Sequence, residues 1–170
     1  MKKLTNFLLF IWPAILTFGV VWVLFSFVLV IAIVPTASMS PTIEPRSIVL
    51  GIRFWNNIER GDVVIFQGVD AYGNSMQYIK RVAGVGAETF EIRDGDIYSN
   101  GEKVEYPYRH TALDGDSFGP VEMPEDTYIM LGDNQDNSYD SRKWEEPLVH
   151  QNDITAKALF SFGGGNWKIF

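Results

Sequence analysis

The stretch "ETFEIRDGDIYSNGEKV", residues 88–104, decides the fold class of this chain, because it joins short runs of β-forming residues through two tight-turn signals. Asp94-Gly95 and Asn100-Gly101 are dipeptides that accept the positive φ angles of a two-residue hairpin turn. The stretch therefore predicts a β-hairpin with a second turn behind it.

Similar runs, rich in Val, Ile, Phe and Tyr, recur on both sides of this hairpin, and no stretch after residue 34 keeps a helical period. The region 106–125 is rich in Pro, Gly and Asp, and we expect a loop or small insertion there. We expect a mainly β chain with a single compact antiparallel β-sheet domain over residues 35–170. Its remaining strands are predicted in SIVLGIRFW (47–55), GDVVIF (61–66), MQYIKRVAGV (76–85), TYIMLGD (127–133) and ITAKALFSF (154–162).

The two ends of the chain are apolar in different ways. Residues 7–34 carry no charge. This uncharged run is longer than the roughly 20 residues that span a bilayer and longer than the roughly 7 to 15 residues of a cleavable signal peptide core. We expect a retained transmembrane anchor there. The last residues, "SFGGGNWKIF", predict a flexible glycine joint followed by an apolar end that either docks on the domain or touches lipid.

Charge suggests how this anchor is oriented. Lys2 and Lys3 precede the apolar run, whereas the whole chain has 14 Lys and Arg against 21 Asp and Glu, a net charge of -7. Because basic flanks stay in the cytoplasm, we expect residues 1–6 to be cytoplasmic and the domain to lie on the outer face of the plasma membrane.

Composition also limits the chemistry. The chain has no cysteine, which excludes a disulfide framework, a cysteine zinc site and a cysteine nucleophile. The two histidines, His110 and His150, lie in loop-like segments. We expect no cofactor and no metal, no nucleic-acid partner for so acidic a chain, and a monomer.

A serine nucleophile would then need a base other than histidine. In "MQYIKRV", strand alternation places Lys80 in line with Met76, Tyr78 and Val82. A lysine in apolar surroundings has a lowered pKa and can act as a base, although a strand lysine can also extend to the rim of its sheet. Ser38, in "IVPTASMSPT", is by itself an ordinary loop serine.

A third segment, "MLGDNQDNSYDSRKW", residues 130–144, follows a predicted strand and is dense in polar groups. One interpretation is a polar turn whose Asp and Asn side chains cap their own backbone. The other is a bonded network in which an Asp140–Arg142 pair holds Ser138 in place. Periodicity leaves both open.

Together these segments resemble the type I signal peptidases, membrane-bound Ser/Lys endopeptidases that remove signal peptides from exported proteins. The serine box S-M-x-P-T stands at residues 38–42, the lysine box Y-I-K-R at 78–81, and G-D-N-x-D-x-S-x-D-S-R at 132–142. "RGDVVIF", residues 60–66, matches a further family strand. Two departures are the missing proline in 84–88, where the family has G-x-P-G-D, and a last strand that matches only approximately.

The resemblance implies roles for individual residues. Ser38 would be the nucleophile and Lys80 the general base, with the Ser38 N–H and the Thr36 hydroxyl as oxyanion donors. Preprotein signal peptides and the lipid bilayer would be the partners, with cleavage after Ala-x-Ala sites. The remaining expected residues are Ser138, which orients the lysine, Asp140 and Arg142, which hold its loop, and Val34, Met39 and Ile79, which line the substrate pockets.

Other classes of protein share some of these features. A signal-anchored surface β-domain without activity explains the apolar run and the strands but gives no reason for Lys80 on an apolar face. A Ser/Lys maturation protease for one secreted substrate would share the mechanism. An inactive homologue would lack residues that are present here. Ala37 also leaves cleavage by a second copy open.

Overall fold

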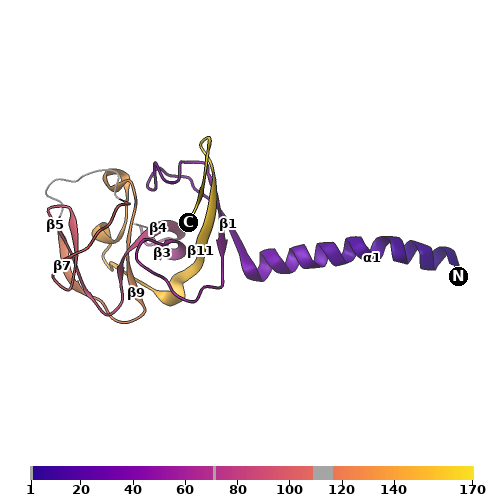
Figure 1. Ribbon diagram of the computed structural model, residues 1–170, viewed down its shortest axis with the longest axis horizontal. Coiled ribbons are helices and arrows are strands. Elements are labelled where there is room, and N and C mark those ends of the chain that lie inside the picture. The colour runs from indigo at the N-terminus through magenta and orange to yellow at the C-terminus, as the bar shows by residue number, and fades with distance from the viewer. Residues whose placement is uncertain (1, 71, 109–116) are drawn as a thin grey trace.

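The computed structural model describes residues 2–70, 72–108 and 117–170. Helix α1 (Lys2–Val23) continues into a π-helical turn, η1 (Leu24–Val28), and extends away from a β domain (Figure 1). Within the described part of the chain, one segment, Phe10–Val28, is long and apolar enough to cross a membrane, and none of it is buried by the rest of the protein.

The strands form two antiparallel sheets, which confirms the mainly β antiparallel fold. The larger has eight strands in the order β1-β2-β11-β3-β4-β9-β10, with β12 paired to β11, and the smaller has the order β7-β6-β5-β8. The smaller sheet lies at the end of the domain far from α1 (Figure 1). The strands are β1 (Leu29–Ile33), β2 (Ile48–Ile52), β3 (Val63–Val69), β4 (Ser75–Val85), β5 (Thr89–Arg93), β6 (Asp96–Ser99), β7 (Glu102–Lys103), β8 (Phe118–Glu122), β9 (Thr127–Leu131), β10 (Leu148–His150), β11 (Ile154–Gly163) and β12 (Asn166–Ile169).

The hairpin that decided the fold class is present. Asp94 and Gly95 have φ angles of 49° and 82°, and Asn100 and Gly101 have 51° and 82°. These left-handed pairs connect β5 to β6 and β6 to β7, as the turn chemistry of these residues predicts. Every other predicted strand segment also contains a strand.

Two segments differ from expectation in the region of the smaller sheet and at the carboxyl end. Part of the predicted loop 106–125 is a strand, β8, which pairs with β5; residues 109–116, with His110, lie outside the described residues. The predicted flexible joint is a tight turn at residues 164–165, and β12 returns along β11 as a hairpin. Gly and Pro residues lie within or beside these strands. Because such residues normally indicate turns or loops, the sequence pattern did not predict a strand in either segment.

The predicted anchor, residues 7–34, is also not one continuous helix. Helical structure ends at Val28, and Leu29–Ile33 form β1, which pairs with β2. Val30 and Ala32 are buried, whereas Ile31 and Ile33 are exposed, so this strand alternates between the core and the outer face. Because every residue here is apolar, the sequence pattern does not reveal the alternation.

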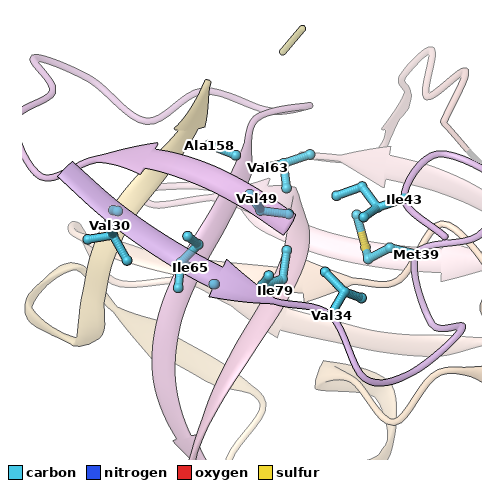
Figure 2. Close-up of a cluster of buried hydrophobic side chains, with 11 residues drawn as sticks. Val30, Val34, Met39, Ile43, Val49, Val63, Ile65, Ile79 and Ala158 are labelled. Atoms are coloured by element: carbon cyan, nitrogen blue, oxygen red, sulfur yellow. The ribbon is translucent and has the colours of Figure 1, made fainter. Parts of the chain in front are cut away.

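One core cluster supports the loop that follows β1. Val34, Met39, Ile43 and Ile79 belong to it, and Figure 2 shows Met39 beside Ile43. Met39 and Ile43 have exposed fractions of 0% and 1%. These two side chains therefore anchor the loop to the body of the sheet.

Candidate active site

The serine loop is closed at its base by the backbone. Val34 N donates to Ser47 O at 2.9 Å, and Arg46 N donates to Val34 O at 2.7 Å. Within the loop, Ile43 N donates to Met39 O at 2.8 Å, which makes a single helical turn. Ser38 thus sits on a short, internally bonded loop directly after β1.

Lys80 on β4 and Ser38 are in direct contact. Lys80 Nζ donates to Ser38 Oγ at 2.6 Å, and Thr36 Oγ1 lies 3.3 Å from the same oxygen. The Lys80 residue is only 4% exposed. The alternative of a lysine extending to the rim of the sheet is therefore wrong.

Burial changes the acidity of this lysine. Removal from water lowers the pKa of Lys80 from its ordinary 10.5 to about 8, because the charged form loses its hydration. The carboxylates of Asp140 and Asp133 act in the opposite direction. The neutral amine, which alone can accept a proton, is therefore accessible close to neutral pH.

The loop after β9 contains a side-chain cap of its own backbone and the Asp140–Arg142 ion pair. Arg142 Nε and Nη2 donate to the two oxygens of Asp140, each at 2.9 Å, which is a two-point ion pair. The Asp140 carboxylate also caps the short helix η3 (Ser141–Lys143) and accepts from Gly132 N at 3.1 Å. The predicted Asp140–Arg142 pair is thus present and closes the loop onto the end of β9.

A second buried ion pair lies beside the first, and sequence reasoning did not find it. Arg81 Nε and Nη2 donate to the Asp133 carboxylate at 2.8 and 2.6 Å. The Tyr108 ring covers the guanidinium at 4.1 Å. Arg81 directly follows Lys80, and Asp133 lies within the polar segment 130–144; that placement was the available signal.

Ser138 lies close to Ser38 across a glycine. A Cβ atom built on Gly132 would collide with Ser138 Oγ and with the Ser38 carbonyl oxygen, so only glycine permits this approach. Lys143 Nζ donates to Ser138 O at 2.6 Å. Within the residues that the structure describes, the buried Ser138 hydroxyl has no hydrogen-bond partner.

A cavity of about 530 Å³ lies beside Ser38 and Lys80. Val34 and Ile79 contribute apolar wall, whereas Met39 is buried behind it and is not among the lining residues. The polar lining includes Thr36, Ser38, Lys80 and Ser138. Among the residues described, no group of three or more His, Asp or Glu side chains is placed to hold a metal ion.

The cavity is bordered by two strand edges. Among the described strands, β1 occupies one end of its sheet and pairs only with β2. β9 pairs with β4 from Arg81 to Val85 only, so the preceding part of β4, which includes Gln77 and Ile79, is not bonded to β9. Residues of both edges line the cavity, at 32–35 and 76–80.

Comparison with known proteins identifies the family of this chain. A family model described as signal peptidase, peptidase S26, matches residues 4–163. Signal peptidase I S of Bacillus subtilis is 34% identical over 130 residues, 69% of this chain and 68% of that protein. A signal peptidase I of Leptolyngbya laminosa is 34% identical over 137 residues, 76% of this chain and 66% of that protein.

Two further matches cover less of this chain. A probable signal peptidase I-2 of Synechocystis is 35% identical over 117 residues, so the match spans about half, 53%, of that protein. A crystal structure of a signal peptidase I from Enterococcus faecalis has 24% identity and a TM-score of 0.49, covering 61% of this chain and 98% of that one. Because the family model matches nearly the whole length of this chain, the chain belongs to the signal peptidase family, peptidase S26.

Proposed function

We propose that this protein is a membrane-anchored serine endopeptidase that removes signal peptides from exported preproteins with Ser38 and Lys80 as its catalytic pair. The observation that carries the proposal is the 2.6 Å hydrogen bond between Lys80 Nζ and Ser38 Oγ inside a lined cavity. Family membership supports a peptidase directed at signal peptides.

The chemistry follows from this contact. Neutral Lys80 takes the Ser38 proton as Oγ attacks the scissile carbonyl carbon, and the carbonyl oxygen becomes an oxyanion. The Lys80 ammonium then gives its proton to the leaving nitrogen, which leaves an acyl-enzyme ester. Lys80 next activates a water that hydrolyses the ester. Thr36 Oγ1 and the Ser38 N–H are the donors for the oxyanion.

The cavity suits an extended substrate with small side chains. A peptide placed between the edges of β1 and β4 could bond to both, as peptides do when they add a strand to a sheet. Its alternate side chains would face the wall formed by Val34 and Ile79, which are branched and largely fixed in the core. Such a wall favours alanine at alternate positions, which is the Ala-x-Ala pattern.

The anchor would hold this site at the membrane surface. The apolar helical segment ends at Val28, and β1 begins with the next residue, so only a short strand separates the span from the serine loop. A signal peptide, whose apolar segment lies in the bilayer, would present its cleavage site at this height. The basic amino-terminal end supports a cytoplasmic start and an outer catalytic domain.

The decisive experiment is cleavage of a preprotein by the full-length chain in detergent micelles. We expect the wild type to cut after the Ala-x-Ala site and Ser38→Ala to be inactive, whereas Ser117→Ala, an exposed serine beside β8, retains activity. No cleavage by the wild type would contradict the proposal and favour a non-enzymatic surface domain. Cleavage of only one of several unrelated preproteins would favour a dedicated maturation protease.

A further inference from the structure

Asn134 holds two consecutive carbonyl groups of the serine loop. Its side-chain Nδ2 donates to Ala37 O at 3.1 Å, and its backbone N–H donates to Ser38 O at 3.1 Å. Ala37 O also accepts from Ser40 N at 3.1 Å. One residue of the polar segment, far away in sequence, thus fixes the backbone on both sides of the nucleophile.

The bond to Ala37 O matters because of peptide planarity. The carbonyl of Ala37 and the N–H of Ser38 belong to the same trans peptide unit, in which the C=O and N–H point in opposite directions. Whatever holds the oxygen therefore also directs the N–H. Within the described part of the chain, the Ser38 N–H donates no hydrogen bond to the protein, so it is available to a ligand in the cavity.

The side chain of Asn134 does not cap the helix that follows it. Asn134 directly precedes the short helix η2 (Gln135–Asn137), where an Asn side chain commonly caps its own turn. Its side chain makes no such bond, unlike that of Asp140, which does cap η3. A carbonyl oxygen can only accept, so the amide nitrogen of Asn134 must be the atom that faces Ala37 O.

We propose that Asn134 is a positioning residue that keeps the Ser38 N–H directed at the oxyanion, an inference that rests on the proposed function. Asn134 does not touch the reacting atoms. Without its side chain, the Ala37–Ser38 peptide loses one of the two donors on its oxygen and can rotate. Rotation would turn the N–H away and bring a carbonyl oxygen toward the developing negative charge.

The test compares Asn134→Ala with the wild type and with Asn152→Ala, an exposed asparagine in η4 (Gln151–Asp153). Loss of an oxyanion donor typically lowers kcat about 10²- to 10³-fold, and loss of its support should cost less. We expect Asn134→Ala to lower kcat for preprotein cleavage about 10- to 100-fold with KM nearly unchanged, and Asn152→Ala to match the wild type.

A second readout separates positioning from general damage. A peptide aldehyde with an Ala-x-Ala sequence forms a bond between Ser38 Oγ and its carbonyl carbon; the serine proton passes to Lys80 and the carbonyl oxygen becomes an oxyanion. A peptide with an uncleavable bond binds without that charge. Asn134→Ala should weaken the aldehyde by the same factor as kcat/KM and leave binding of the uncleavable peptide unchanged.

Other outcomes overturn the inference. Equal loss of affinity for both ligands, a changed apparent pKa in the pH profile, or full activity would each contradict it. If Asn134→Ala fails to fold, Asn134→Leu keeps nearly the same shape and removes the donor without adding charge, and the aldehyde comparison applies to it unchanged. An inactive wild type would instead overturn the proposed function, and this inference with it.

Discussion

Lys80 Nζ and Ser38 Oγ are 2.6 Å apart, although the residues are separated by 42 positions in the chain. Burial on β4 removes the amine from water, while the loop after β1 brings the hydroxyl to it. Among the described residues, no carboxylate is hydrogen-bonded to this base in the way that an aspartate orients a catalytic histidine. The geometry of the pair therefore depends on how firmly the sheet, the serine loop and the loop after β9 hold Lys80 and Ser38.

The pH profile of cleavage should report the lysine. Only neutral Lys80 can accept the serine proton, and its pKa is lowered to about 8 by burial. We expect kcat/KM to rise with pH to a plateau above about 8, and to fall about tenfold per pH unit well below it. Steady-state cleavage of a preprotein between pH 5 and 10 checks this, and flat activity through mildly acidic pH would argue against a lysine base.

The same lysine should destabilise the fold at neutral pH. Its pKa is about 8 in the folded state and 10.5 ordinarily, which at about 1.4 kcal/mol per pH unit corresponds to about 3 kcal/mol. The folded state disfavours the charged amine, so this penalty is complete below pH 8 and disappears as pH rises to about 10.5. Lys80→Met should therefore be inactive and yet more stable at pH 7, by up to about 3 kcal/mol.

Thermal unfolding of full-length protein in detergent, followed by tryptophan fluorescence at pH 7 and pH 10.5, measures this difference. The matched control is Lys103→Met in β7, where no buried ammonium is removed. Lower stability of Lys80→Met at pH 7 would show that the contacts of the lysine outweigh its burial.

Local chemistry predicted much of the fold. The turn at Asp94-Gly95 needs only its own residues to form, so the hairpin of β5 and β6 was predictable. β1 was not, because in a uniformly apolar run nothing marks where helix gives way to strand. β8 was missed for the opposite reason, since Gly119 and Pro120 interrupt a strand that pairing with β5 stabilises.

In the site too, local patterns predicted some features, whereas contacts between distant segments could not be predicted. Alternation placed Lys80 on an apolar face, but only the family resemblance paired it with Ser38, because the period of a strand says nothing about which loop lies above it. The Arg81–Asp133 pair and the Asn134 bond to Ala37 join segments distant in sequence. Such contacts depend on sheet register, which no local pattern encodes.

Ser138 gives a test that separates activity from stability. Its buried hydroxyl has no partner among the described residues, so its removal breaks no hydrogen bond within them. We expect Ser138→Ala to leave the melting temperature within about 1 °C or raise it, since a buried unsatisfied polar group is itself costly. If Ser138 orients the lysine during the reaction, kcat should fall at least tenfold, less than the about 10²- to 10⁴-fold that a positioned proton-transfer group itself contributes.

The comparison variant is Ser75→Ala, at the exposed start of β4, which should change neither property. Circular dichroism melting and preprotein cleavage, measured on the same samples, supply both numbers. Unchanged kcat in Ser138→Ala would remove Ser138 from the catalytic machinery, whereas a large loss of stability would mean that its hydroxyl is bonded in solution.

The Arg81–Asp133 pair, like the equally buried Asp140–Arg142 pair, should be far more sensitive than the exposed ionic contacts in the described part of the domain. Both side chains are nearly inaccessible, with exposed fractions of 5% and 0%, and they share two hydrogen bonds. Asp133→Asn leaves a buried guanidinium without its counter-charge, which typically costs about 3 to 5 kcal/mol. The matched exposed pair is Lys103–Asp96, for which Asp96→Asn should cost less than about 1 kcal/mol.

Chemical denaturation of the full-length variants in detergent at pH 7 compares the two. Asp133 precedes Asn134, which holds the serine loop, so Asp133→Asn should also lower kcat in the fraction that remains folded. Because the Asp133 carboxylate raises the pKa of Lys80, its neutralisation should in addition move the rising limb of the pH profile toward lower pH. A shift toward higher pH, or equal costs for the buried and exposed pairs, would contradict this account of how the ion pair supports the site.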